Sequence, residues 1–207
     1  VWSIDTASGD KTKIYTDERR NGAEISLSND GKWLAYTKRR ANFMSDMFLY
    51  DFTTGTHTQV TDRMSHTASP AFSPDGQYLY FAASTNAGST AVGLDMTSQE
   101  RPQRYGLYAV VLAADGKSPL LPKTGDEVAK AEKKAKGDDA AGDATTKVDV
   151  AGISDRIVAL PVAERFYTGL QVASDGSLFF VENPQAGTSI ETNGRAPRDG
   201  SLIRFDF

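Results

Sequence analysis

Residues 69–81 read SPAFSPDGQYLYF, and this stretch is the most informative part of the sequence about the fold. It consists of an apolar segment, an Asp-Gly pair and a second apolar segment, which is the pattern of a β-hairpin. Residues 24–36 (EISLSNDGKWLAY) and residues 169–181 (GLQVASDGSLFFV) repeat it in register. The Asp-Gly pairs of the first two copies are 45 residues apart. We predict that each Asp-Gly pair supplies the positive φ of a two-residue hairpin turn.

A second segment repeats with nearly the same period. Residues 4–9 (IDTASG) align with residues 50–55 (YDFTTG), and two later segments occupy the same place, 107–112 (LYAVVL) and 202–207 (LIRFDF). A short strand is expected after each of the first three segments, at residues 12–15, 58–61 and 156–162. Four strands in about 40–50 residues is the sequence pattern of a β-propeller blade.

The sequence therefore predicts an all-β fold, a partial β-propeller with four-stranded antiparallel blades. The strands of one blade are lettered A to D from the centre outward. Two whole blades lie between two partial ones, with boundaries at residues 1–18 (strands C and D), 19–63 (whole), 64–163 (whole) and 164–207 (strands A, B and C). A β-sandwich with coincidental hairpins is the alternative, and three aligned Asp-Gly hairpins argue against it. Residues 1–5 (VWSID) resemble the middle of a strand, so we expect a piece of a longer protein.

Composition argues against several classes of function. The 207 residues carry 23 Lys and Arg against 27 Asp and Glu, a net charge of −4, which disfavours nucleic acid and an anionic membrane surface as partners. The sequence contains no cysteine, which rules out a disulfide, a thiolate zinc site and a cysteine nucleophile. No apolar run approaches the roughly 18 residues that a membrane-spanning helix needs.

Two segments interrupt the repeat, both within the second whole blade. Residues 84–104 lie between strands B and C and are rich in Ser, Thr, Gly and Ala. Residues 123–149 lie between strands C and D, contain no aromatic residue and mix lysines with aspartates. Such a composition cannot bury enough apolar surface to offset the loss of chain entropy, so we expect a mobile surface loop. Within it, the Ala, Glu and Lys content of residues 126–136 favours a short solvated helix.

The chain has two histidines, and their spacing does not indicate a metal site. We expect His57 in the threonine-rich hairpin between strands C and D of the first whole blade. We expect His66 just before the next strand A, as a turn residue or as the partner of a neighbouring carboxylate. A Ser-His-Asp triad would have to assemble from residues far apart in the sequence. No Gly-x-Ser-x-Gly elbow and no glycine-rich phosphate loop is present, so we assign no catalytic residue, no cofactor-binding residue and no metal ligand.

Two sets of aspartates and one set of aromatic residues repeat in register. The first aspartates stand in the A–B turns, where an aspartate caps its own backbone: Asp30, Asp75 and Asp175. The second aspartates stand near the end of strand C: Asp5, Asp51 and Asp206. The aromatic residues begin strand B: Trp33, Tyr78 and Phe179. We expect the aspartates to build the blades, and the aromatic residues to pack between blades rather than to form a ligand cage.

Residues 68–81 (ASPAFSPDGQYLYF) resemble the propeller repeats that TolB-like and tricorn-like proteins share. Further stretches narrow the resemblance to tricorn-like serine proteases: 94–96 (LDM) leading to 105–112 (YGLYAVVL), 118–122 (SPLLP) with the charged tract after it, and 150–162 (VAGISDRIVALPV). The resemblance covers nearly the whole chain. It places the chain in the latter part of a propeller, the second of the family's two.

This resemblance implies a parent protein with two propellers, a PDZ-like module and a C-terminal serine peptidase domain. The propellers are implied to filter peptide substrates and to route them to or from a chamber. The Ser nucleophile and His base lie in other domains of the family, so no catalytic residue is carried over to this chain and no cofactor is implied. The resemblance also implies a cytoplasmic location, with the bacterial periplasm as the alternative.

Two other functions stay open from the sequence, because one architecture hosts all three. A prolyl-oligopeptidase-type enzyme predicts a downstream Gly-x-Ser-x-Gly elbow, whereas a tricorn-like protease predicts a downstream PDZ-like domain. A TolB-like module that holds a protein partner predicts neither. The partial blades also leave open strand edges at residues 2–15 and 202–207, so we expect a dimer, a higher oligomer or association through these edges.

Overall fold

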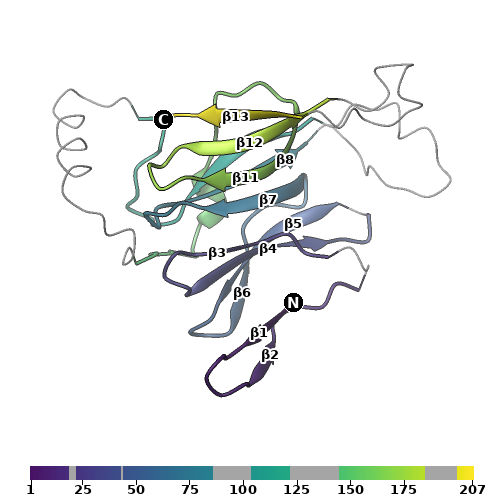
Figure 1. Ribbon diagram of the computed structural model, residues 1–207, viewed down its shortest axis with the longest axis vertical. Coiled ribbons are helices and arrows are strands. Elements are labelled where there is room, and N and C mark those ends of the chain that lie inside the picture. Colours follow the sequence, from purple (N-terminus) through teal and green to yellow (C-terminus); the bar gives the residue numbers. More distant parts are fainter. Residues whose placement is uncertain (19–21, 43, 86–103, 122–144, 185–199) are drawn as a thin grey trace.

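The computed structural model describes residues 1–18, 22–42, 44–85, 104–121, 145–184 and 200–207 (Figure 1). These residues form four antiparallel sheets in chain order. The first sheet pairs β1 (Trp2–Ile4) with β2 (Lys11–Lys13). The second has the order β3-β4-β5-β6, formed by β3 (Ile25–Leu27), β4 (Trp33–Arg39), β5 (Ser45–Asp51) and β6 (Thr56–Gln59).

The second half of the chain forms the other two sheets. The third sheet has the order β7-β8-β9-β10, formed by β7 (His66–Phe72), β8 (Tyr78–Ser84), β9 (Gly106–Val111) and β10 (Ile157–Ala159). The fourth has the order β11-β12-β13, formed by β11 (Phe166–Val172), β12 (Leu178–Asn183) and β13 (Ser201–Phe205). A 3-10 helix, η2 (Ile153–Arg156), precedes β10. No helix in the described parts of the chain is long and apolar enough to cross a membrane.

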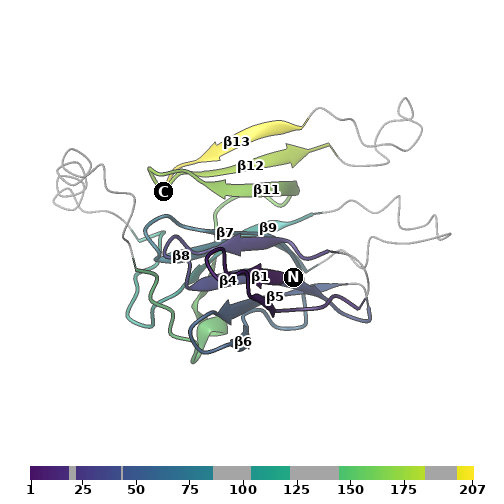
Figure 2. The same ribbon diagram turned by 60° about the horizontal axis from the view of Figure 1, so that its bottom comes forward.

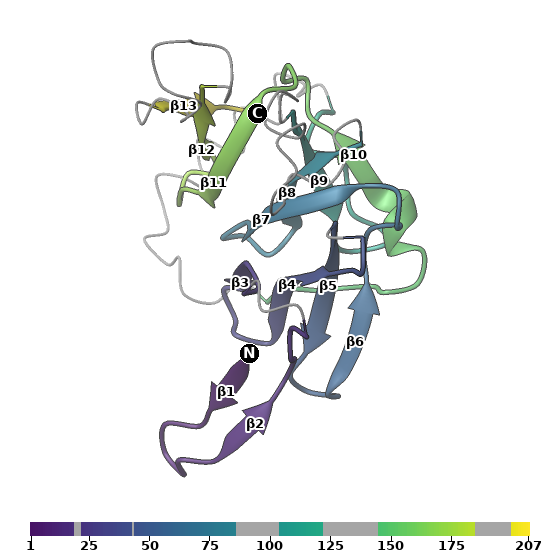
Figure 3. The ribbon, with the colours of Figure 1, turned by 90° about the vertical axis from the view of Figure 1, so that its right-hand side faces the viewer.

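The sheets radiate from a common centre, where β3, β7 and β11 lie nearest one another (Figure 3). β6 and β10 lie at the outer ends of their sheets, so the strands run from A to D outward. Two four-stranded antiparallel blades stand between two partial ones, which confirms the predicted all-β propeller architecture.

The core lies between successive blades, which are stacked face to face (Figure 2). In β8, Phe81 faces the first whole blade and packs with Met47 and Leu49, whereas Tyr80 faces the last blade and packs with Phe180. This alternation follows from the two-residue period of a strand. Burying one side chain as large as Phe81 contributes about 1.5–3 kcal/mol, so each blade is stabilised mainly by its neighbours.

Hydrogen bonds across the blade boundaries also join the inner strands. The N–H of Phe72 donates to Ser26 Oγ at 3.1 Å, and the N–H of Gly169 donates to Ser69 Oγ at 3.2 Å. The N–H of Ser69 donates to the carboxylate of Glu24. The three strands at the centre are therefore linked in sequence, each to the next.

A β-bulge recurs in two of these inner strands. The register shifts between Ala68 and Ala71 in β7, and at the equivalent place in β11. Gly169 takes a φ of 66° in the second bulge, and Ser69 takes a φ of 53° in the first. Ser69 is the one non-glycine residue with positive φ in the described ranges. A bulge frees backbone groups from the ladder, and two of the cross-blade bonds described above use such N–H groups, those of Ser69 and Gly169.

The A–B turns differ from the two-residue turns expected from the sequence. The N–H of Ser28 donates to the carbonyl of Trp33 at 2.8 Å, so residues 29–32 form a four-residue loop. Only Gly31 has a positive φ in this loop, at 69°. The predicted turn type is wrong because Asp30 keeps a negative φ and caps the loop, accepting a hydrogen bond from Ser28 Oγ at 2.7 Å. The capping role expected for this aspartate is confirmed.

The end of the second insertion is also different from the prediction. Thr146 is only 3% exposed, and its N–H donates to Asp30 Oδ2 at 2.9 Å. The carboxylate of Asp149 accepts a hydrogen bond from the backbone of the C–D turn of the second whole blade. The expected mobile loop is therefore wrong for residues 145–149, because two blades supply partners for their polar groups. The preceding part, with the predicted helix at 126–136, lies outside the described residues, as does most of 84–104.

Candidate functional site

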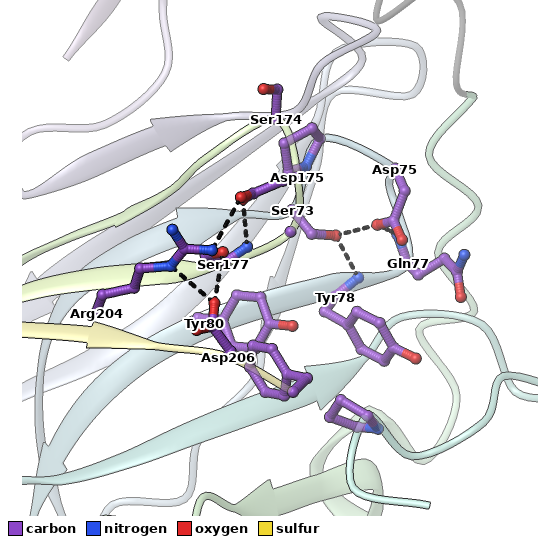
Figure 4. A pocket seen from close by; sticks show the side chains of 14 residues that line it. Ser73, Asp75, Gln77, Tyr78, Tyr80, Ser174, Asp175, Ser177, Arg204 and Asp206 are labelled. Carbon is purple, nitrogen blue, oxygen red and sulfur yellow. Dashed lines mark hydrogen bonds and ion pairs between the residues drawn. The ribbon is translucent and has the colours of Figure 1, made fainter. Parts of the chain in front are cut away.

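An open groove of about 590 Å³ lies between the second whole blade and the last, partial blade (Figure 4). Two A–B turns contribute to its walls, at residues 73–77 and 174–177, and the end of the chain contributes Arg204, Asp206 and Phe207. The turns and Arg204 supply polar groups, and Tyr78, Tyr80 and Phe207 supply aromatic surface. We call this hollow the turn groove.

The first of the two turns is fixed by Ser73. Its Oγ donates to Asp75 Oδ1 at 2.6 Å and accepts a hydrogen bond from the N–H of Tyr78 at 2.9 Å. Ser28 makes the same pair of bonds in the preceding blade. The last blade has Ala173 in this place, so its turn lacks these two bonds. The side chains of that turn are consequently free to make other contacts.

Those contacts are made with Arg204. Its Nε donates to Asp206 Oδ1 at 2.8 Å, and its terminal nitrogen lies 3.2 Å from Asp175 Oδ2. Ser177 Oγ also donates to Asp206, at 2.8 Å. The N–H of Ser177 lowers the pKa of Asp175, and the hydrogen bond from Arg204 lowers the pKa of Asp206, so both carboxylates are ionised at neutral pH. The groove thus carries anionic and cationic groups side by side.

The aromatic surface of the groove is continuous with the core. The rings of Tyr80 and Phe207 are 5.4 Å apart, and those of Tyr78 and Tyr80 are 6.0 Å apart. The hydroxyl of Tyr78 donates to the carbonyl of Lys117 at 3.0 Å, which fixes the ring. Burial and the neighbouring Asp75 raise the pKa of Tyr78, so its hydroxyl stays protonated. A groove with aromatic surface and polar turns suits an extended peptide, whose backbone and side chains need both.

The two histidines lie away from this groove and apart from each other. His57 lies in β6, within the C–D hairpin as expected, and its Nδ1 is 2.9 Å from the hydroxyl of Tyr36. His66 is the first residue of β7 rather than a turn residue, and its Nδ1 accepts a hydrogen bond from the N–H of Ser45 at 2.9 Å. Burial lowers the pKa of both imidazoles. Across the described ranges, no three His, Asp or Glu side chains gather closely enough to hold a metal ion.

The expected roles of the repeated aspartates hold for some members. Asp5 and Asp51 accept hydrogen bonds from backbone N–H groups of their own C–D turns, at 2.8 and 2.7 Å. Asp206 differs, because it binds Arg204 and Ser177 in the turn groove.

The repeated aromatic position is also used in more than one way. Trp33 packs against the core between the two whole blades, as expected. Tyr78 packs against the core and lines the turn groove as well. The expected third member, Phe179, does not share this position, because Leu178 is the residue that stands three places after Asp175. The ring of Phe179 lies 5.8 Å from the guanidinium of Arg204.

Sequence reasoning missed the turn groove altogether. Its residues come from four separate segments, and only the packing of two blades brings Tyr80 and Arg204 to the same hollow. One signal was available in the sequence: the third repeat has Ala173 where the other two have Ser28 and Ser73. The change to Ala173 marks the one of the three A–B turns whose aspartate is bonded to Arg204 instead of to the hydroxyl of a serine two residues before it.

Comparison with known proteins assigns this arrangement to a family. The model of the family described as "Tricorn protease second beta propeller domain" matches residues 1–207. This chain belongs to that family. The tricorn protease homolog 1 of Streptomyces coelicolor is 26% identical over 191 residues, which covers 90% of this chain and 17% of the homolog. The chain thus spans less than a fifth of that tricorn relative.

Solved structures support the same fold for this tricorn propeller domain. The crystal structure of tricorn protease superposes with a TM-score of 0.67 at 17% identity, over 99% of this chain and 19% of that one. The structure of TolB from Acinetobacter baumannii superposes with a TM-score of 0.54 at 16% identity, over 100% of this chain and 34% of that one. The resemblance to tricorn-like proteins is therefore confirmed, and TolB shares the propeller fold.

Proposed function

We propose that this segment of a tricorn propeller contacts peptide substrates and guides them toward a peptidase domain that lies outside this chain. The turn groove carries the proposal. It is a hollow of about 590 Å³ with aromatic surface and paired charges, between two blades that a continuous core holds together. The segment acts as a scaffold and a gate, and the peptide bond is cut elsewhere in the parent protease.

Two features support a binding role for the groove. Its walls are rigid, because Ser73, Asp75 and Tyr78 are joined by hydrogen bonds and the second wall is joined through Arg204. Rigid walls lower the entropy cost of binding a flexible peptide. Membership of the tricorn family supports peptides as the ligand class.

The experiment blocks the groove in the full-length parent. Ser174 is exposed in the second wall, so Ser174→Trp fills the hollow without entering the core. The matched control is Asn29→Trp, at the same turn position of the first whole blade, outside the groove. Hydrolysis of fluorogenic peptides of increasing length is measured for the parent, for both variants and for this chain alone, with and without a serine-directed inhibitor.

We expect kcat/KM for long peptides to fall about tenfold in Ser174→Trp, which corresponds to about 1.4 kcal/mol, and to be unchanged in Asn29→Trp. Hydrolysis of short peptides stays the same, and this chain alone is inactive. Equal rates for Ser174→Trp and the parent at every peptide length would overturn the guiding role. Hydrolysis by this chain alone would place the peptidase here.

A TolB-like protein-binding module is the second candidate, because the shared fold reaches a TM-score of 0.54 over the whole chain. That candidate predicts an inactive parent and a stable complex with a protein partner. Our proposal includes a cytoplasmic location, with the bacterial periplasm as the alternative. Cell fractionation of the parent separates the two.

A further inference from the structure

A second hollow, of about 370 Å³, lies between the two whole blades, and we call it the inter-blade groove. The connection between β6 and β7 contributes residues 61, 62, 64 and 65 to one wall, and η2 contributes to another. The floor comes from the second whole blade and includes Phe81, Tyr108 and Ile157. None of these residues lines the turn groove.

The floor of this groove is apolar. The rings of Phe81 and Tyr108 are stacked, with 5.6 Å between centroids and 22° between planes. Met64 lines the groove with 75% of its surface exposed, an unusual position for a thioether. An exposed methionine adapts its shape to a ligand and packs well on an aliphatic chain.

Two arginines hold the walls in place. Arg40 donates to the carbonyls of Arg63 and Ser65 and pairs with the buried Asp46 at 3.0 Å. Arg156 fixes the wall at η2 by donating to backbone carbonyls of residues 111, 112, 149 and 151. The groove is therefore formed before any ligand arrives, which lowers the entropy cost of binding.

The charge of the groove is one-sided. Its lining includes two carboxylates, Asp62 and Asp155, and no lysine or arginine among the described residues that line it. The guanidinium groups of Arg40 and Arg156 donate to the backbone carbonyls named above. Asp62 is held by accepting a hydrogen bond from the N–H of Met64 at 3.1 Å, which fixes the carboxylate at the end of this wall.

We propose that the inter-blade groove binds the side chain of a lysine or arginine within an extended peptide. The aliphatic stem lies on Phe81, Ile157 and Met64, and the cationic head reaches Asp62 and Asp155. Long basic side chains bind in this way because the stem gains from burial while the charge keeps polar partners. That the ligand is a peptide rests on the proposed function, whereas its basic side chain is inferred from the lining of the groove.

The test compares labelled peptides that differ at one central position, carrying lysine, norleucine or glutamate, by fluorescence anisotropy. Norleucine keeps the stem and lacks the charge. We expect the lysine peptide to bind about fivefold more tightly than the norleucine peptide at low salt, and the difference to shrink with added salt. In the double variant Asp62→Asn with Asp155→Asn the difference disappears, because asparagine keeps an acceptor for Met64 and loses the charge. Asp10→Asn, an exposed turn aspartate outside the groove, keeps the difference.

A second measurement locates the peptide. With 13C-methyl methionine, the signal of Met64 shifts on adding the lysine peptide, and that of the fully buried Met47 does not. Equal affinities for lysine and norleucine, a Met64 signal that stays in place, or no saturable binding would overturn the inference. This assay measures binding to the inter-blade groove, and the hydrolysis assay above probes the turn groove, so either proposal can fail while the other stands.

Discussion

The N–H of Thr146 donates to Asp30 Oδ2 at 2.9 Å, across 116 positions of the sequence. Thr146 belongs to the end of an insertion in the second whole blade, and Asp30 caps the A–B turn of the first. The same threonine lies against Gly76 in the A–B turn of its own blade. One short segment therefore joins the turns of two neighbouring blades, in addition to the core between them.

The first prediction concerns the bond to Asp30. Asp30→Ala removes the turn cap and the partner of the buried Thr146 N–H, so we expect a loss of about 2–4 kcal/mol in the free energy of unfolding. Asp75→Ala is the matched control, because Asp75 caps its turn in the same way and is bonded to Ser73 and Gln77. We expect the control to lose about 1 kcal/mol less, by urea denaturation. Equal losses would show that the bond to Thr146 contributes nothing.

The second prediction concerns close packing at Gly76. A Cβ at this position would lie 2.8 Å from Thr146 Oγ1 and 3.0 Å from Thr146 Cα, whereas a Cβ at Gly31 meets nothing within 4 Å. Both glycines have a φ of 69°. Gly31→Ala is therefore expected to lower the free energy of unfolding by about 1–2 kcal/mol, because alanine is strained in the left-handed conformation. Gly76→Ala is expected to lower it by a further 1–3 kcal/mol, roughly, because of the clash with Thr146. The change in thermal midpoint measures both, and similar midpoints would contradict the close contact.

The third prediction concerns Ser69, whose φ of 53° is unusual for a residue with a side chain. Ser69→Ala keeps the conformation and loses the acceptor for Gly169, so we expect a loss of about 1 kcal/mol. Ser69→Gly loses the same bond but removes the strain at positive φ, so its stability stays within about 0.5 kcal/mol of that of the unsubstituted chain. Chemical denaturation distinguishes the two variants. If Ser69→Ala were more stable than Ser69→Gly, the proposed backbone strain at Ser69 would be refuted.

The fourth prediction is a dependence on pH through His66. Burial lowers its pKa below 6.5 in the folded chain, Arg39 and Arg40 lower it further, and Glu24 opposes them. The unfolded chain thus takes up this proton more readily. The stabilisation is fully present above pH 6.5 and is lost as the pH falls through the folded pKa.

The measurement is the urea midpoint between pH 5 and pH 8. His66→Asn keeps an acceptor for the N–H of Ser45 and does not titrate, so we expect it to lose less stability on acidification than the parent chain. His57→Asn serves for comparison, because the pKa of the more exposed His57 is lowered as well. If the urea midpoints of the unsubstituted chain and of His66→Asn changed with pH in the same way, this effect would be excluded.

The fifth prediction concerns the open edge of β13, which pairs with β12 on one side and with no described strand on the other. Leu202 in this strand is 69% exposed. We expect the chain to associate through this edge at high concentration, and Leu202→Lys to weaken the association, since lysine protects strand edges. Leu121→Lys, at a 52% exposed residue outside the strands, is the control. Sedimentation velocity over a concentration series measures the association. If the unsubstituted chain stays monomeric at high concentration, the prediction is ruled out.

Particular residues show how much of the fold could be predicted from the sequence. The three Asp-Gly repeats predicted the hairpins of β3–β4, β7–β8 and β11–β12, because alternation and turn residues act over a few positions. The turn type was wrong, since loop length depends on which residues pair across the hairpin: the N–H of Ser28 donates to the carbonyl of Trp33, that of Ser73 to Tyr78 and that of Ala173 to Ser177. The start of β7 was missed by one residue, at His66, for a similar reason. Strand ends depend on pairing partners.

Local patterns of apolar residues and turn residues were enough to predict the all-β architecture, the number of strands in each whole blade and the family. The two grooves, in contrast, could be located only from the packing of the blades. Arg204 meets Asp175 and Tyr80 meets Phe207 because two blades pack face to face, and Asp62 and Asp155 meet one groove because two arginines fix its walls. The residues of each groove are far apart along the chain, and the free energy that brings them together is the burial of side chains between blades.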